Sequence, residues 1–175
     1  MITLSLDLST KSSGWAIFDG QELKDYGCIT AGSANLYKRI DKMIEELEKI
    51  LNQYKIDNIM IEDVLPEDVR NNQNVFKALT YLQGFVLHLL DKHNLSNIKF
   101  YTASEWRKKC GIHTGRGIKR ESLKPKDIQF VYSQFGIKVN DDVADAICIG
   151  FAAVGGAIKE LQKVIETDEY GFEFG

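Results

Sequence analysis

Apolar and polar residues alternate at the start of the chain, and this period of two predicts a β-strand that ends near Asp7. The apolar positions of that strand are Ile2, Leu4, Leu6 and Leu8. A turn leads into an apolar run over 15–18, and the dipeptide Asp19-Gly20 is a strong signal for a hairpin. Residues 23–30 predict a third strand, so the chain opens with an antiparallel meander.

Two later segments carry apolar residues at spacings of three and four, which predicts two amphipathic helices. Short apolar runs predict two more strands, and Pro125 suits the first position of a later helix. Asn140-Asp141 can cap a last, very apolar helix. After the meander, the predicted elements are a helix over 36–51, a strand over 56–64, a helix over 74–94, a strand over 98–102, a helix over 125–135 and a helix over 141–161.

A meander followed by strand–helix–strand crossovers predicts an α/β protein with a five-stranded mixed sheet. Strands one to three would be antiparallel, the later strands parallel, and helices would cover both faces. This arrangement resembles the RNase H-like fold. The length of 175 residues suits one domain, which we place at residues 1–165, followed by an acidic tail over 166–175 that we expect to be mobile.

The composition favours a cytoplasmic protein. Three scattered cysteines, Cys28, Cys110 and Cys148, favour a reducing compartment over a disulfide framework. Cys110 and His113 lack a second pair of ligands, which disfavours a structural zinc site. We find neither an apolar run of membrane-spanning length nor the pattern of a signal peptide, and therefore expect no membrane partner.

The net charge of -3 conceals a basic segment over 107–126, in which Glu121 is the only acid. A basic segment on an acidic body indicates a polyanion partner, and a solvated basic loop is the alternative. Three glycines, at 111, 115 and 117, predict a loop here. The basic residues of the segment are Arg107, Lys108, Lys109, Arg116, Lys119, Arg120, Lys124 and Lys126.

Four acids form the candidate site. Asp7 and Glu62 end the first and fourth predicted strands, which would bring both to one edge of the core if these strands are neighbours. Asp142 and Asp145 lie three residues apart, on one face of the last helix. Turn formation, solvent exposure or the helix dipole could explain the others, but Asp145 lies inside an apolar helix, where capping cannot account for it.

Carboxylates without matching basic residues nearby in sequence indicate hard divalent cations. Mg²⁺ and Mn²⁺ prefer carboxylate oxygen and water as ligands. Two such ions in one site can activate a water molecule and stabilise the leaving oxygen of a phosphodiester. The sequence therefore predicts a metal-dependent nuclease whose ligands are Asp7, Glu62, Asp142 and Asp145.

Four blocks of the sequence together resemble the RuvC family of Holliday junction resolvases, in the form found in phages. The blocks are LSLDLSTKSSGWAIF, NIMIEDV, SEWRKKCGIHTGRGIKRE and DDVADAICIG. The resemblance runs from Met1 to about Gly156 and implies that Asp7, Glu62, Asp142 and Asp145 bind the metal. Asp141 competes with Asp142, and the D-x-x-D register of the family favours Asp142.

The resemblance implies a homodimer that makes paired, symmetric nicks in four-way junctions. We expect the second long helix to form the interface, with Phe85 and Leu89 as contacts, although core packing would explain either residue. The sequence departs from the family where Leu8-Ser9 replaces Pro-Gly, and where Leu65 replaces an aromatic residue that can stack on a base. Leu65 predicts weak sequence preference and recognition of branched shape.

The basic segment is our candidate for DNA contacts, because phosphate contacts position DNA without reading its sequence. Near Glu62, a polar loop that includes Arg70 and Asn71 could reach the junction centre or could only cap a helix. Trp106 could stack on a base, although a buried core position explains it better. The residues expected to hold phosphates are Lys108, Lys109, Arg116, Lys119 and Arg120.

Three other functions compete with the resolvase interpretation. DLSTKSSGWAIF also resembles the first phosphate loop of actin-like ATPases and sugar kinases, which need two such domains and a second loop. A nuclease acting on RNA–DNA hybrids would share the acidic site. A DNA-binding module that lost catalysis would not need all four acids.

Overall fold

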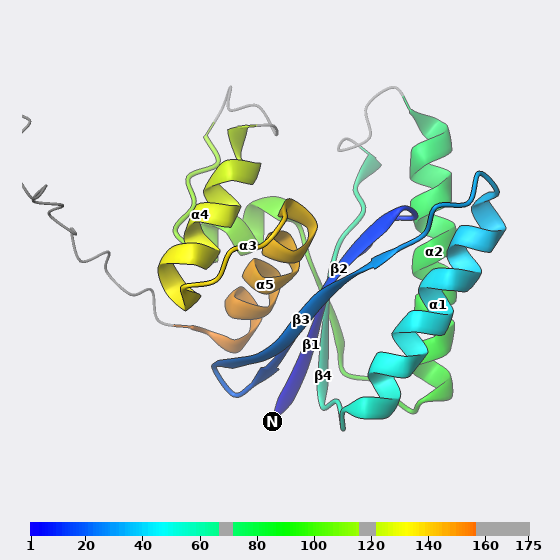
Figure 1. Ribbon diagram of the computed structural model, residues 1–175, viewed down its shortest axis with the longest axis horizontal. Coiled ribbons are helices and arrows are strands. Elements are labelled where there is room, and N and C mark those ends of the chain that lie inside the picture. Colours follow the sequence, from blue (N-terminus) through cyan, green and yellow to red (C-terminus); the bar gives the residue numbers. More distant parts are fainter. Residues whose placement is uncertain (67–71, 116–121, 157–175) are drawn as a thin grey trace, which may run out of the picture.

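The computed structural model describes residues 1–66, 72–115 and 122–156. A single mixed sheet separates two layers of helices (Figure 1). The strands are β1 (Ile2–Asp7), β2 (Ser12–Asp19), β3 (Glu22–Thr30), β4 (Asn58–Glu62) and β5 (Ile98–Tyr101). The helices are α1 (Leu36–Gln53), α2 (Gln73–Lys92), α3 (Ala103–Lys109), α4 (Lys124–Phe135) and α5 (Asp141–Val154).

The sheet has the order β3-β2-β1-β4-β5. Strand β2 pairs antiparallel with both β1 and β3, whereas β4 pairs parallel with both β1 and β5. The predicted antiparallel meander followed by parallel strands is therefore confirmed. Strand β1 is central and is the place where the sheet changes from antiparallel to parallel pairing.

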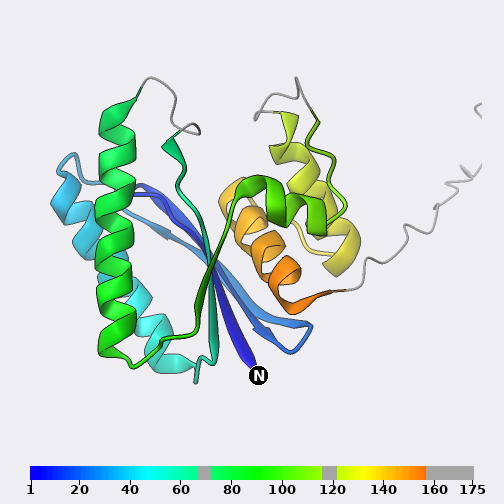
Figure 2. The same ribbon diagram turned by 180° about the vertical axis from the view of Figure 1, so that it is seen from behind.

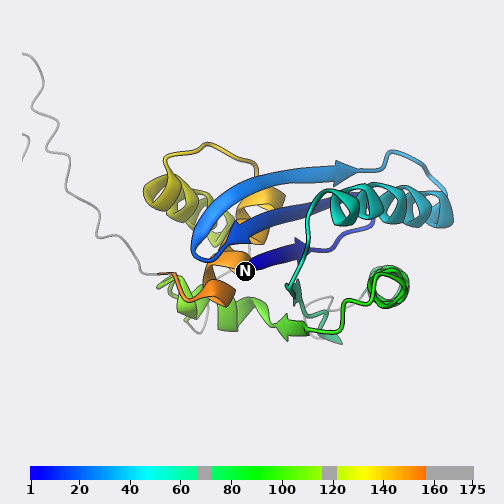
Figure 3. The same ribbon diagram turned by 90° about the horizontal axis from the view of Figure 1, so that it is seen from below.

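Helices α1 and α2 cover one face of the sheet, and α3, α4 and α5 cover the other (Figures 1 and 2). The view from below shows the sheet running between the two layers (Figure 3). Each face has its own apolar core, and alternation along the strands supplies both. Leu4 and Leu6 of β1 belong to the core beneath α1 and α2. Phe18 of β2 and Ile147 of α5 belong to the core on the other face.

Helix α5 lies close against β1 and β2 because small residues stand at the contact. A Cβ atom at Gly150 would come within 2.4 Å of the Phe18 ring and 2.6 Å of the Ser5 Oγ atom. The Ser5 hydroxyl instead donates a 2.7 Å hydrogen bond to the carbonyl oxygen of Ala146. At the start of α5, a Cβ atom at Gly14 would lie 1.9 Å from the carbonyl oxygen of Asp142. The first turn of α5 is therefore held directly against β2.

Two sequence predictions about helices are wrong. The start of the basic segment is helical through Lys109, because Thr102 and Glu105 form a capping box and Trp106 packs into the core. The last helix ends at Val154, not at residue 161, because Gly155 adopts a left-handed conformation with φ of 66°. The acidic tail and the domain boundary at residue 165 lie outside the described residues. Within the described ranges, none of the helices is long and apolar enough to cross a membrane.

Candidate active site

Asp7 and Glu62 occupy matching positions on neighbouring strands. The parallel register of β1 and β4 pairs Leu6 with Ile61, so Asp7 and Glu62 are the next positions along the two strands. Alternation places both side chains on the face that carries Ser5 and Met60, which is the face covered by α5. The expected meeting of these two acids at one edge of the sheet follows from this register.

Helix α5 brings the other two acids to the same face. Asn140 caps the helix by accepting a 3.0 Å hydrogen bond from the backbone N–H of Val143. Asp142 lies in the first turn, and Asp145 lies one turn further, where its side chain faces the sheet with only 6% of the residue exposed. Its neighbours along the helix, Ala144 and Ala146, are fully buried.

The electrostatic environment of Asp145 shows that the acids are close enough to repel one another. Burial, followed by the negative charges of Asp7 and Asp127, raises the pKa of the Asp145 carboxyl from 3.8 to about 9. Arg107 opposes this shift, and Glu62 contributes to it. The Oδ1 atom of Asp145 is buried and accepts no hydrogen bond from any described residue. A buried carboxylate oxygen without a donor, beside two more acids, fits a divalent cation.

Each of the other acids on α5 has its own partner. Asp141 forms an ion pair with Lys124, and the hydrogen bond from Lys124 lowers the pKa of the Asp141 carboxyl. Asp142 instead accepts a hydrogen bond from the hydroxyl of Ser12 on β2. The two candidates for the third ligand therefore differ in their partners. The ammonium group of Lys124 already neutralises the charge of Asp141, whereas Asp142 accepts a hydrogen bond from the neutral hydroxyl of Ser12.

Glu62 is contacted by a side chain that sequence reasoning did not assign to the site. The indole N–H of Trp106 donates a 2.9 Å hydrogen bond to Oε2 of Glu62. Trp106 is fully buried, so the alternative of a core position is confirmed and base stacking is wrong. The helical spacing of Trp106 and Cys110, both buried, is the sequence signal that could have placed this face of α3 in the core.

Arg107 is also buried, which the count of basic residues did not predict. Its guanidinium forms hydrogen bonds of 2.8–3.1 Å with both carboxylate oxygens of Asp127, which is fully buried. Its Nη2 atom lies 3.7 Å from Oδ2 of Asp145. Arg107 therefore compensates buried acids and is not available as a surface contact for DNA.

The carboxylates approach one another without forming a closed cluster. Among the residues that the structure describes, no three His, Cys, Asp or Glu side chains are grouped so that they could hold one ion. Three of the acids contact donors on the surrounding elements: Glu62 contacts Trp106, Asp142 contacts Ser12, and Asp145 lies beside Arg107. Ion binding would therefore require the carboxylates to move closer together.

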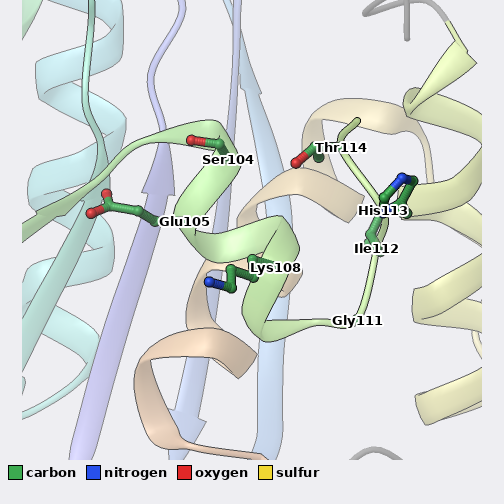
Figure 4. Close-up of a pocket in the computed structure, with 7 residues that line it drawn as sticks. All are labelled: Ser104, Glu105, Lys108, Gly111, Ile112, His113 and Thr114. Carbon is green, nitrogen blue, oxygen red and sulfur yellow. The ribbon is translucent and has the colours of Figure 1, made fainter. Parts of the chain in front are cut away.

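Of the residues expected to bind DNA, Lys108 and Lys109 are described, and both are exposed on α3. Lys108 lines a pocket of about 440 Å³ with Ser104 and His113 (Figure 4). The pocket lies between α3 and the stretch that follows it, where Figure 4 labels Gly111 to Thr114. The other residues expected at the DNA, which lie outside the described residues, are Arg70, Asn71, Arg116, Lys119 and Arg120.

Comparison with known protein sequences identifies one family. The family model for crossover junction endodeoxyribonuclease RuvC matches residues 4–154. The RuvC protein of Ehrlichia ruminantium (strain Welgevonden) is 30% identical over 159 residues, which cover 85% of this chain and 95% of that protein. The RuvC protein of Fusobacterium nucleatum is 29% identical over 154 residues, which cover 85% of this chain and 77% of that protein.

Solved structures show the same fold at low sequence identity. The RuvC protein of T. thermophilus, determined in complex with a Holliday junction substrate, superposes with a TM-score of 0.71 and 11% identity, over 89% of this chain and 93% of that chain. The fowlpox virus resolvase, determined with Holliday junction DNA, gives a TM-score of 0.51 and 16% identity, over 88% and 97% of the two chains. The expected RNase H-like fold is confirmed by these likenesses.

Proposed function

Because this chain belongs to the RuvC family of crossover junction endodeoxyribonucleases, we propose that it cuts Holliday junctions and related branched DNA. It is an endodeoxyribonuclease that depends on divalent metal ions and makes paired, symmetric nicks. The observation that carries this function is the buried carboxyl of Asp145, whose Oδ1 atom has no donor among the described residues and whose pKa is raised in part by the charges of Asp7 and Glu62.

The metal ligands are Asp7, Glu62, Asp142 and Asp145, and Asp141 is not among them. When bound, Mg²⁺, or Mn²⁺ in its place, supplies an activated water molecule and neutralises charge at the phosphodiester, and four carboxylates suit two ions. The protein positions these carboxylates on three regular elements, β1, β4 and α5. Ser12 and Trp106 orient two of them without neutralising their charge.

The DNA surface follows from the exposed lysines beside this site. Lys108 and Lys109 project from α3, the helix that also contacts Glu62 and Asp145 through Trp106 and Arg107. Phosphates bound at these lysines would therefore lie next to the acids. Leu65 offers no aromatic face for a base, and this supports recognition of branched shape with weak sequence preference.

Two-fold symmetric cutting needs two active sites, and we propose that a homodimer provides them. Helix α2 supports this assignment because Val75, Tyr81 and Phe85 are 41–50% exposed. Leu89 is 4% exposed and belongs to the core, so it is not available at an interface. Phe85→Glu is expected to give monomers in light scattering, whereas Tyr37→Glu, at an exposed aromatic residue of α1, should leave the mass unchanged.

Incubation with matched substrates tests the reaction. The substrates are a synthetic four-way junction, a linear duplex with the same arm sequences, and an RNA–DNA hybrid, each with Mg²⁺ or EDTA. We expect symmetric nicks in the junction alone and only with Mg²⁺. Asp7→Asn should bind the junction with wild-type affinity and cut it on the order of a thousandfold more slowly, because a lost metal ligand removes several kcal/mol of charge stabilisation in the transition state. Equal cutting of the duplex, or normal cutting by Asp7→Asn, would contradict the proposal.

A further inference from the structure

Trp106 and the strand before it, β5, both contact Glu62. Glu62 pairs with Tyr101 at the end of the β4–β5 register, and the backbone N–H of Asp63 donates a 2.8 Å hydrogen bond to the carbonyl oxygen of Tyr101. Five residues later, the indole N–H of Trp106 reaches Oε2 of Glu62 at 2.9 Å. The backbone and the side chain of Glu62 are thus held by one continuous segment.

The orientation of Trp106 is fixed from several sides. The capping box of Thr102 and Glu105 sets the start of α3 directly after β5. The indole is fully buried, and the guanidinium carbon of Arg107 lies 4.2 Å from the ring centroid. Arg107 is itself anchored by Asp127. An indole packed in this way has little freedom, so the direction of its N–H is set before any ligand arrives.

The indole N–H of Trp106 carries no charge, which suits a carboxylate that is to bind a metal ion. A lysine or arginine at this position would hold Glu62 but would also neutralise the charge that a cation needs. An indole N–H is a neutral donor with a single hydrogen, so it restrains one oxygen, Oε2, and adds no charge beside the carboxylate. Any buried tryptophan needs an acceptor for its N–H, and a backbone carbonyl would serve equally well. Here the acceptor is the one acid at the end of β4 that faces α5.

We propose that Trp106 is a positioning residue that sets the orientation of the Glu62 carboxylate for metal binding, an inference that rests on the proposed function of this site. Through the adjacent Arg107, which lies 3.7 Å from Asp145, the same short helix also contacts the acid on α5. Helix α3 thereby fixes Glu62 and Asp145 relative to each other. Partners that orient metal ligands typically affect metal affinity or activity by about 10- to 100-fold.

The decisive variant is Trp106→Phe, which removes the N–H and keeps a buried aromatic ring. Its matched control is Trp15→Phe, because the chain has two tryptophans and Trp15 packs with the core on the opposite face of the sheet. Thermal unfolding is measured in EDTA and over a range of Mg²⁺ concentrations. We expect Trp106→Phe to need about tenfold more Mg²⁺ for half of the ion-dependent stabilisation. Trp15→Phe should need the wild-type concentration.

A purely structural role would lower the melting temperature of Trp106→Phe equally in EDTA and in Mg²⁺, and that result would overturn the proposal. An unchanged or lower half-saturating Mg²⁺ concentration would overturn it as well. If Mg²⁺ does not stabilise the wild-type protein, the metal site itself is wrong, and the role of Trp106 fails with it. A wild-type response combined with a normal Trp106→Phe response contradicts only the positioning role.

Fluorescence gives a second measurement that does not depend on the folding of Trp106→Phe. In Trp15→Phe, Trp106 is the one remaining tryptophan, and its indole is bonded to Glu62. We expect Mg²⁺ to change its emission over the same concentration range that stabilises the protein, and Asp7→Asn in this background to abolish the change. Emission that stays constant while Mg²⁺ stabilises the protein would show that Glu62 and Trp106 are not coupled to the site.

Discussion

Ser12 and Asp142 are 130 residues apart in sequence, yet the hydroxyl of Ser12 donates a hydrogen bond to Oδ2 of Asp142. The contact exists because Gly14, two residues along β2, lets the strand approach the first turn of α5. Ser12 also lies 2.9 Å from the thiol sulfur of Cys28, so the hydroxyl is held from two sides. The carboxylate of Asp142 on α5 is therefore oriented by a side chain of β2.

Removal of the Ser12 hydroxyl should weaken metal binding without unfolding the protein. For Ser12→Ala we expect roughly a tenfold higher Mg²⁺ concentration at half-maximal cleavage, because Asp142 loses the donor that fixes its rotamer. Ser12→Thr keeps a hydroxyl in a residue that favours strands, and it should retain wild-type behaviour. A normal Mg²⁺ dependence for Ser12→Ala would show that the rotamer of Asp142 is fixed by other contacts.

The two neighbouring acids at the start of α5 should differ sharply when mutated. Asp142→Asn is expected to abolish cleavage while junction binding persists. Asp141→Asn should keep cleavage within about a few-fold of wild type, because Asp141 is paired with Lys124 and exposed ion pairs contribute about 0–1 kcal/mol. Single-turnover cleavage at saturating Mg²⁺ measures both effects. The reverse order of effects would assign the third ligand to Asp141.

Asp145 should make the protein less stable as the pH rises, when no divalent ion is present. Its pKa is about 9 in the folded protein and near the ordinary 3.8 when unfolded, so the folded state binds the proton more tightly. Stability from this group is greatest below about pH 4 and is lost as the pH rises toward 9. Asp145→Asn mimics the protonated form and should raise the melting temperature in EDTA, more at pH 8 than at pH 5.

The same measurement contains its own control. With Mg²⁺ present, wild-type protein should regain stability at pH 8, whereas Asp145→Asn should not respond. A melting temperature that Asp145→Asn leaves unchanged at both pH values would contradict the electrostatic account of this residue.

Arg107 and Lys108 are adjacent in sequence but should have separate roles. Arg107→Met would leave Asp127 buried without its cation, and breaking such a pair typically destabilises a protein by about 3–5 kcal/mol. Lys108→Met should leave the free energy of unfolding unchanged and weaken junction binding. The slope of log affinity against log salt should fall by about one if the lysine contacts a phosphate. Urea denaturation and salt-dependent binding separate the two outcomes, and a stable Arg107→Met would contradict the assignment.

Much of the fold follows from the sequence because its elements are strongly periodic. The central strand, the meander and both long helices arise from apolar spacing alone, and the parallel register of β1 and β4 then aligns Asp7 with Glu62. Helix α3 stands where the glycines predict a loop, and α5 ends earlier than its apolar pattern predicts. Side chain–backbone capping at Thr102 and the left-handed Gly155 decide these ends, and periodicity carries no information about either.

The partners of the acids could not be predicted, because each comes from a distant part of the chain. Trp106 is 44 residues from Glu62, and Arg107 is 20 residues from Asp127. A count of charges treats Arg107 and Lys108 alike, although one is buried and the other is exposed. Which basic residue compensates a buried acid is decided by where α3 lies relative to Asp127 on α4 and Asp145 on α5.

The register of β1 against β4 has a consequence for how the enzyme can be assayed. A slip of one residue between these parallel strands would turn Glu62 to the opposite face of the sheet from Asp7. Misregistered molecules could keep their secondary structure and compact size, but they would lack the paired acids. Cleavage per molecule after refolding therefore measures the fraction of chains in which two segments more than fifty residues apart have found their correct alignment.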